Sequence, residues 1–256
     1  MERNSLITIG DWPWMVPLFK KTLLGLQFFC SSTLISYSLA LTAAHCIKFK
    51  NFLTVKMEDI IAYVGKLDIT NWTEENSQPR LLNEIHIHPD FDSDDLHSDL
   101  AVIKFKKPVN PAYNVAPACL WQGDDKLSSV VGKKGVVFGW GADGTGNKLT
   151  STPKLAVMPI ISQEECLRSK IEFLFLTTNR TFCAGFRNGT GPCSGDSGGG
   201  LLLPQRDKYG NLRWFLRGII SLSLLQDSSL KCDVHQYSVF TDVAKYQNWI
   251  FNYVEN

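Results

Sequence analysis

The chain has 256 residues, of which 44% are hydrophobic and 20% charged, an ordinary composition for a soluble globular protein. Its 26 basic and 25 acidic residues nearly cancel, so charge gives no reason to expect nucleic acid or an anionic membrane as partner. No uninterrupted apolar run is long enough for a transmembrane helix. The length fits one large domain or two small ones.

Short apolar or alternating runs recur along the chain between turn residues, a pattern typical of an all-β sandwich or barrel. The expected strands cover 28–34, 60–64, 100–105, 135–140, 154–161, 199–203, 214–222 and 237–243. A short helix is predicted over 162–168, where Ser162 caps the first turn and Glu165 follows three residues later. The segment 243–256 predicts a terminal helix, because its apolar residues fall on one face at helical spacing.

The most informative segment is CSGDSGGG, which covers residues 193–200. A serine hydroxyl is a poor nucleophile at neutral pH, so it needs an adjacent base and fixed donors for the oxyanion that it generates. The glycines let the backbone turn so that the amide hydrogens of Gly195 and Ser197 can converge on one point. Taken alone, the pattern is equally consistent with a glycine-rich surface turn.

Two further segments supply candidate partners for Ser197. In LTAAHC, His45 follows an apolar strand and small residues. In HSDLAVI, Asp99 directly precedes a strand that must be buried, and a buried carboxylate is costly unless it is hydrogen-bonded. Alone, His45 would more often be a structural histidine, and Asp99 could belong to a solvated acidic loop. The three segments together are far more specific than any one of them.

In chain order, His45, Asp99 and Ser197 resemble the catalytic triad of the chymotrypsin-type serine proteases. There the serine attacks the peptide bond, the histidine is the general base and the aspartate orients the histidine. The resemblance runs from the first strand to the terminal helix, and residues 188–200 look most like insect modular and gastrulation-defective-type proteases. The rival α/β-hydrolase fold needs the order serine, acid, histidine, but only His235 follows Ser197, and no βαβ pattern precedes it.

The resemblance implies an all-β fold of two packed six-stranded antiparallel β-barrels with a C-terminal α-helix. It implies one peptidase domain over 1–256, with the barrels at 12–113 and 114–242, joined near the Pro-rich segment 108–117, and the helix at 243–256. Gly195 and Ser197 would form the oxyanion hole, and the substrate-binding positions would be Gly191, Pro192, Ser221, Ser223 and Ser238.

None of these substrate-binding residues carries a carboxylate, which an enzyme specific for Arg or Lys would need. We therefore expect cleavage after apolar or aromatic residues such as Leu, Phe or Tyr. Ser223 stands where relatives have glycine and should narrow the mouth of the pocket.

Six of the seven cysteines pair by the resemblance: Cys30 with Cys46, Cys166 with Cys183, and Cys193 with Cys232. Cys119 remains, at the position that in many relatives bonds a segment N-terminal to the protease domain. An odd cysteine implies an intermolecular partner or missing sequence, with a buried free thiol as the alternative.

Sequons at Asn71, Asn179 and Asn188, together with the cysteines, favour a secreted, extracellular glycoprotein, although no signal peptide is evident. The expected partners are protein substrates, including another protease zymogen, a serpin-type inhibitor, and an N-terminal regulatory segment bound through Cys119. We expect no nucleic acid, membrane or cofactor. We also expect no metal, because Lys66 stands where many relatives have the first acidic ligand of a calcium loop.

Activation is where the sequence departs from the family pattern. Relatives are cut before an Ile/Val-Ile/Val-Gly-Gly segment, and the new ammonium inserts beside the aspartate at the position of Asp196. Counting back from Trp14 places that terminus near Met1, where no such segment exists, and the ITIG of residues 7–10 lies too close to Trp14 to reach. Asp196 is therefore expected to be an unpaired buried charge or to face solvent, as in a zymogen.

These features predict a serine endopeptidase of an extracellular zymogen cascade that acts through an acyl-enzyme intermediate. On the activation pattern we expect this chain to be a truncated or alternatively started product with low activity. The alternative function is a zymogen-like or catalytically weak regulatory homologue that lacks the activation N-terminus.

Overall fold

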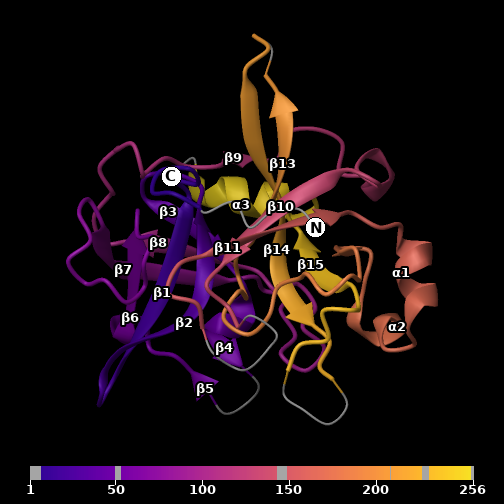
Figure 1. Cartoon of the computed structure of the whole chain (residues 1–256), viewed down its shortest axis with the longest axis horizontal. Helices are drawn as coiled ribbons and strands as arrows, with labels where there is room; N and C mark the ends of the chain where they lie inside the picture. The colour runs from indigo at the N-terminus through magenta and orange to yellow at the C-terminus, as the bar shows by residue number, and fades with distance from the viewer. Residues whose placement is uncertain (1–6, 50–52, 143–148, 208, 227–230, 255–256) are drawn as a thin grey trace.

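The computed structural model describes residues 7–49, 53–142, 149–207, 209–226 and 231–254, and it places two β-barrels side by side (Figure 1). Met1 and the last two residues of the expected C-terminal helix lie outside the described part. Among the described residues, no helix is long and apolar enough to cross a membrane.

The first barrel is closed and six-stranded, with its strands in the order β1-β2-β3-β8-β7-β6 and β6 paired back to β1. Its strands are β1 (Met15–Thr22), β2 (Gly25–Leu34), β3 (Leu39–Thr42), β6 (Ile60–Val64), β7 (Gln78–Ile87) and β8 (Ala101–Phe105). All four residues of β3 are buried, as is most of β8, so these two strands form the wall that carries the candidate site. A separate two-stranded ribbon, β4 (Lys48–Phe49) and β5 (Leu53–Thr54), follows β3 in the chain.

The second barrel has six strands in the order β11-β10-β13-β14-β15-β12, and an isolated bridge between Ile160 and Ala184 joins its two edges. Its strands are β10 (Lys134–Gly139), β11 (Lys154–Pro159), β12 (Thr181–Ala184), β13 (Gly200–Arg206), β14 (Leu212–Ser223) and β15 (Ser238–Asp242). The short β9 (Cys119–Leu120) adds a parallel pairing to β14. The β13–β14 hairpin projects from the body of the molecule (Figure 1). The expected all-β fold of two six-stranded barrels is confirmed.

The helices are α1 (Gln163–Ser169), α2 (Phe173–Leu176) and α3 (Gln247–Val254), with a 3₁₀ turn over Val243–Tyr246 before α3. Ser162 caps α1 as expected, because its hydroxyl accepts the amide hydrogen of Glu165 at 3.1 Å. After the second barrel is complete, α3 crosses back to the first barrel, where Tyr253 stacks on His86 of β7 (Figure 1). This return ties the two barrels together.

Several elements lie outside the segments expected from the sequence: β1, β3, β4, β5, β7, β9, β12 and α2. Neither β12 nor α2 has a pattern that marks it in the sequence: β12 is only four residues long and buried on both faces, and α2 is a single turn. Such short segments are defined by their neighbours. In β12, each residue pairs with β15, from Thr181 opposite Thr241 to Ala184 opposite Ser238.

Candidate active site

His45 and Asp99 meet at the end of the first barrel that faces the second. His45 lies in a 3₁₀ turn, Ala44–Cys46, just after β3, and Asp99 stands just before β8. The ring Nδ1 of His45 lies 2.7 Å from Asp99 Oδ2, and the backbone N–H of His45 donates to Oδ1 at 2.9 Å. Burial opposes the charged imidazolium, but the charge and hydrogen bond of Asp99 outweigh it and raise the pKa of His45 above its ordinary value.

Asp99 is fully buried, and residues of the second barrel hold it from the other side. Ser221, in β14, donates its hydroxyl to Asp99 Oδ2 at 2.6 Å. Thr241, in β15, donates to the main-chain carbonyl of Asp99 at 2.9 Å. Thr241 was not expected, because no local pattern marks it. The carboxylate thus depends on both barrels for its partners.

The residue before Asp99 has an uncommon backbone. Ser98 has a φ of 51°, which few residues other than glycine adopt. The hydroxyl of Tyr246 donates to Ser98 Oγ at 3.2 Å and fixes this conformation from the C-terminal segment. Ser98 and Tyr246 were also missed in the sequence, since 148 residues separate them.

Ser197 sits in a tight turn between residues 193 and 200. Asp196 N–H donates to Cys193 O at 2.9 Å, and Gly199 N–H donates to Asp196 O at 3.0 Å. The carbonyl of Ser197 accepts from Ser31 N–H at 2.8 Å, which fastens the turn to β2 of the first barrel. The turn therefore presents Ser197 at the junction of the two barrels, beside the segment that carries His45.

Gly198 allows the turn that carries Ser197 to lie close to β2 and β3 of the first barrel. Its φ is +82°, and a Cβ on it would collide with Thr42 Oγ1 and with the carbonyl of Ser31. Thr42 is the last residue of β3 and stands three residues before His45. Only glycine can therefore occupy this position without separating Ser197 from the histidine segment. Gly195 also has a left-handed φ, of +101°, and its carbonyl accepts from Ser31 Oγ at 3.3 Å.

The side chain of Asp196 is buried and does not face solvent, which is one of the two arrangements expected from the sequence. Its carboxylate accepts the N–H groups of Gly141 at 2.7 Å and Cys193 at 3.0 Å. Burial raises its pKa to about 6, against the opposing effects of these two N–H groups and of Lys154. Asp196 also lines a cavity of about 140 Å³ together with Gly139, Gly141 and Lys154.

The expected substrate-binding residues come together on two facing segments. Ser223 ends β14 and pairs in register with Ser238, the first residue of β15. Gly191 and Pro192 lie on the chain that leads into the Ser197 turn. Ser223 Oγ donates to Pro192 O at 2.9 Å and lies 3.0 Å from Ser238 Oγ.

Comparison with known proteins agrees with this geometry. A profile of the trypsin family matches residues 4–250. The chain belongs to the trypsin family. It is 35% identical to serine protease gd of Drosophila melanogaster over 97% of this chain and 52% of that protein. It is 30% identical to Limulus clotting factor C of Carcinoscorpius rotundicauda over 96% of this chain and 24% of that protein. The chain thus spans about half the length of the first relative and a quarter of the second.

Three disulfides join the six cysteines that were expected to pair: Cys30–Cys46, Cys166–Cys183 and Cys193–Cys232. Cys119 is the free cysteine of the described chain; it is half-buried, and burial raises the pKa of its thiol. The three sequon asparagines are exposed: Asn71, Asn179 and Asn188.

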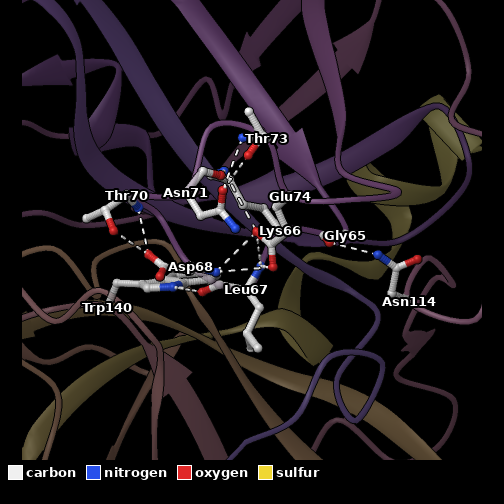
Figure 2. Close-up of polar contacts among 10 residues, drawn as sticks. All are labelled: Gly65, Lys66, Leu67, Asp68, Thr70, Asn71, Thr73, Glu74, Asn114 and Trp140. Atoms are coloured by element: carbon white, nitrogen blue, oxygen red, sulfur yellow. Dashed lines mark hydrogen bonds and ion pairs between the residues drawn. The ribbon is translucent and has the colours of Figure 1, made fainter.

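In the loop that starts at Lys66, the side-chain ammonium of Lys66 is buried and is surrounded by polar groups of the same loop (Figure 2). The buried Lys66 ammonium donates to Asn71 O at 2.6 Å and lies 3.7 Å from Glu74 Oε2. Glu74 in turn accepts the N–H of Leu67 at 2.9 Å. The indole N–H of Trp140 donates to Leu67 O at 2.7 Å, so the loop contacts the second barrel next to the glycines that pack on Asp196.

Proposed function

We propose that Ser197 is the nucleophile, His45 the general base and Asp99 the carboxylate that orients the base. The observation that carries this proposal is the double contact of His45 with Asp99, through Nδ1 and through the backbone N–H. With Nδ1–H directed at the carboxylate, Nε2 is the nitrogen that takes the proton of Ser197 as its oxygen attacks the peptide carbonyl. The imidazolium then protonates the leaving amine, and a water molecule hydrolyses the acyl-enzyme by the same route.

The tetrahedral intermediate needs donors for its oxyanion. The N–H groups of Gly195 and Ser197 supply them, supported by the left-handed conformation of Gly195 within the tight turn. Asp196 lies between these two residues, and we assign it the activating role. A cationic group that enters the cavity beside its carboxylate stabilises the ionised form and, through it, the turn that carries both donors.

The substrate residue on the acyl side of the cleaved bond is uncharged, apolar or aromatic rather than basic. In support, Gly191, Ser223 and Ser238 are the residues at the expected pocket, and none of them can form an ion pair with Arg or Lys.

The two barrels and the C-terminal helix act as a single peptidase domain over 1–256. We divide the barrels at residues 113–114, because no strand lies between β8 and β9 in this described segment. We place the enzyme in an extracellular zymogen cascade, on the name of clotting factor C and the disulfides of an oxidising compartment. Its partners are then protein substrates, among them another protease zymogen, a serpin-type inhibitor, and an N-terminal regulatory segment joined through the half-exposed Cys119.

A fluorophosphonate probe tests the catalytic assignment, because only a serine activated by its base reacts quickly. The chain should be labelled at Ser197, and Ser197→Ala and His45→Ala should abolish labelling. The exposed Ser128→Ala serves as a matched control that keeps it. A folded chain that is never labelled would instead be a regulatory homologue without enzymatic activity.

A further inference from the structure

Arg217 and Asp242 form a buried ion pair inside the second barrel. Arg217 lies on β14, and Asp242 is the last residue of β15, opposite Gly218. Their side chains are 0% and 1% exposed, and Nη2 of Arg217 donates to Asp242 Oδ2 at 2.9 Å. Taking two charges out of water is costly, and apolar residues of similar volume often stabilise a fold as well or better. The pair therefore calls for an explanation other than stability.

The guanidinium of Arg217 also holds a third part of the chain, the segment that follows β9. Nη1 donates to Asp124 O and Nη2 to Asp125 O, both at 3.3 Å. The guanidinium carbon lies 4.6 Å from the centre of the Trp121 ring, within the range of a cation–π contact. The planar group of donors on arginine can bind several partners in fixed directions, which the ammonium of lysine cannot. One side chain thus fixes the end of β15 relative to β14 and to this segment.

The second carboxylate oxygen of Asp242 begins the turn that leads to α3. Asp242 Oδ1 accepts the N–H of Ala244 at 3.2 Å and so caps the 3₁₀ turn Val243–Tyr246. Because Arg217 holds Oδ2, it also fixes the direction in which Oδ1 points. The ion pair and the start of the turn therefore depend on the same carboxylate.

Residues on both sides of Asp242 hold the candidate catalytic carboxylate. Thr241, directly before it, donates to Asp99 O at 2.9 Å. Tyr246, at the end of the capped turn, donates to Ser98 Oγ at 3.2 Å. The position of Asp242 thus sets the positions of two hydroxyl groups, one of which holds Asp99 and the other the residue before it.

We propose that the Arg217–Asp242 pair is a positioning unit, which holds the end of β15 and the following turn so that Asp99 stays aligned on His45. The proposal rests on the proposed function and adds two positioning residues to it. Both act through their neighbours in the chain and not on the reacting atoms. When the pair is broken, the folded enzyme keeps its substrate contacts but its base is poorly directed, so kcat falls while KM hardly changes.

Two variants of Asp242 separate its contacts. Asp242→Asn keeps an acceptor for Ala244 but loses the ion pair, and Asp242→Ala loses both. The rate of fluorophosphonate labelling at Ser197 and kcat on a peptide substrate should fall by about 10-fold in the first variant and further in the second. KM should stay within about twofold of the wild-type value. Burial raises the pKa of Asp242 to about 6, so assays at alkaline pH compare the variants with the ionised pair.

Lys66→Met is the matched control, because it breaks another buried ion pair, that of Lys66 with Glu74. It should destabilise the fold and leave the labelling rate and kcat within about twofold of the wild-type values. Arg217→Lys keeps the positive charge and should retain more activity than Arg217→Met. Asp242 variants that lose stability but are labelled at the wild-type rate would overturn the proposal, because the pair would then support the fold alone.

Tyr246→Phe tests the route through the turn, since it removes only the hydroxyl that holds Ser98. It should slow labelling by itself. Combined with Asp242→Ala, the losses should be less than multiplicative, because the two residues belong to one set of contacts. Multiplicative losses would contradict this route.

The proton between His45 Nδ1 and Asp99 gives a spectroscopic readout. Its downfield NMR resonance should shift or broaden in Asp242→Ala and stay unchanged in Lys66→Met. An unchanged resonance in Asp242→Ala would show that the alignment of Asp99 does not depend on the pair. Failure of the wild-type chain to be labelled at Ser197 overturns the proposed function instead, so the two failures are distinguishable.

Discussion

Ser221 and Asp99 are joined across the two barrels by a hydrogen bond of 2.6 Å between Ser221 Oγ and Asp99 Oδ2. The same oxygen faces His45 Nδ1 at 2.7 Å. The orientation of the base is therefore set by the packing of one barrel on the other as well as by the first barrel.

Removing the Ser221 hydroxyl should weaken catalysis without destroying it. Asp99 keeps the backbone N–H of His45, so we expect Ser221→Ala to lower kcat by about 10-fold, consistent with one lost hydrogen bond to a charged group. Asp99→Asn should cost about 10⁴-fold, because it favours the wrong tautomer of His45. Steady-state kinetics on the best peptide substrate measure both, and equal losses in the two variants would contradict this order.

The pH profile should report the raised pKa of His45. The histidine acts as a base only when neutral, so kcat/KM should fall as the pH drops through a value above the ordinary 6.5. In Asp99→Asn the opposing effect of burial remains, and the pKa of His45 should fall below that of the wild type. Titration of the ring proton by NMR checks both variants. A midpoint at or below 6.5 in the wild type would be the contrary result.

Gly198 and Gly210 provide a matched pair. Both have a left-handed φ, +82° and +84°, but a Cβ on Gly210 meets nothing within 4 Å. Gly210→Ala should cost about 1 kcal/mol of unfolding free energy from backbone strain alone. Gly198→Ala adds the collision with Thr42 and Ser31, so it should cost several kcal/mol and reduce probe labelling of Ser197. Chemical denaturation of both variants, with probe labelling in parallel, measures the difference. Similar losses of unfolding free energy at the two sites would show that a Cβ on Gly198 does not collide with Thr42 and Ser31.

Asp196 should make stability depend on pH in a defined direction. Its folded pKa of about 6 lies above the ordinary 3.8, so between these values the folded state binds the proton and the unfolded state does not. Unfolding free energy should therefore fall by about 3 kcal/mol from this group as the pH rises from about 4 to 6.

The variant Asp196→Asn lacks the titrating group. Its stability relative to the wild type should increase over the same interval and then stay constant. Urea unfolding of both proteins at several pH values measures the difference, and a difference independent of pH would show that Asp196 has an ordinary pKa.

The Lys66–Glu74 pair should behave as a buried unit. The side chains are 1% and 9% exposed, so Lys66→Met leaves the Glu74 charge without its cation and should cost about 3 kcal/mol. The same change at the exposed Lys56 should cost almost nothing. Adding Glu74→Gln to Lys66→Met should recover part of the loss. Additive losses in the double variant would mean that the two residues act independently.

The sequence by itself indicated the candidate catalytic residues and the strands with long apolar patterns. The segments around His45, Asp99 and Ser197 were identified from residue type and order, and the apolar runs located most of the barrel strands because many of these strands are buried on both faces. The role of Ser162 as a helix cap was also predicted from the sequence, because a cap and the amide that it binds are only three residues apart. These are local properties of the chain.

Only the tertiary structure decided which distant groups hold the site in place. The contacts of Thr241 and Tyr246 have no local signal, because their partners, Asp99 and Ser98, lie in the other barrel and are brought to them by the packing of the two barrels. Ser223 was expected to narrow the pocket, but its hydrogen bond to Pro192, 31 residues away, exists only because β14 packs against the segment before Ser197. A hydrogen bond needs a partner within about 3 Å, and for residues so far apart in the chain that distance is set by the packing of the barrels.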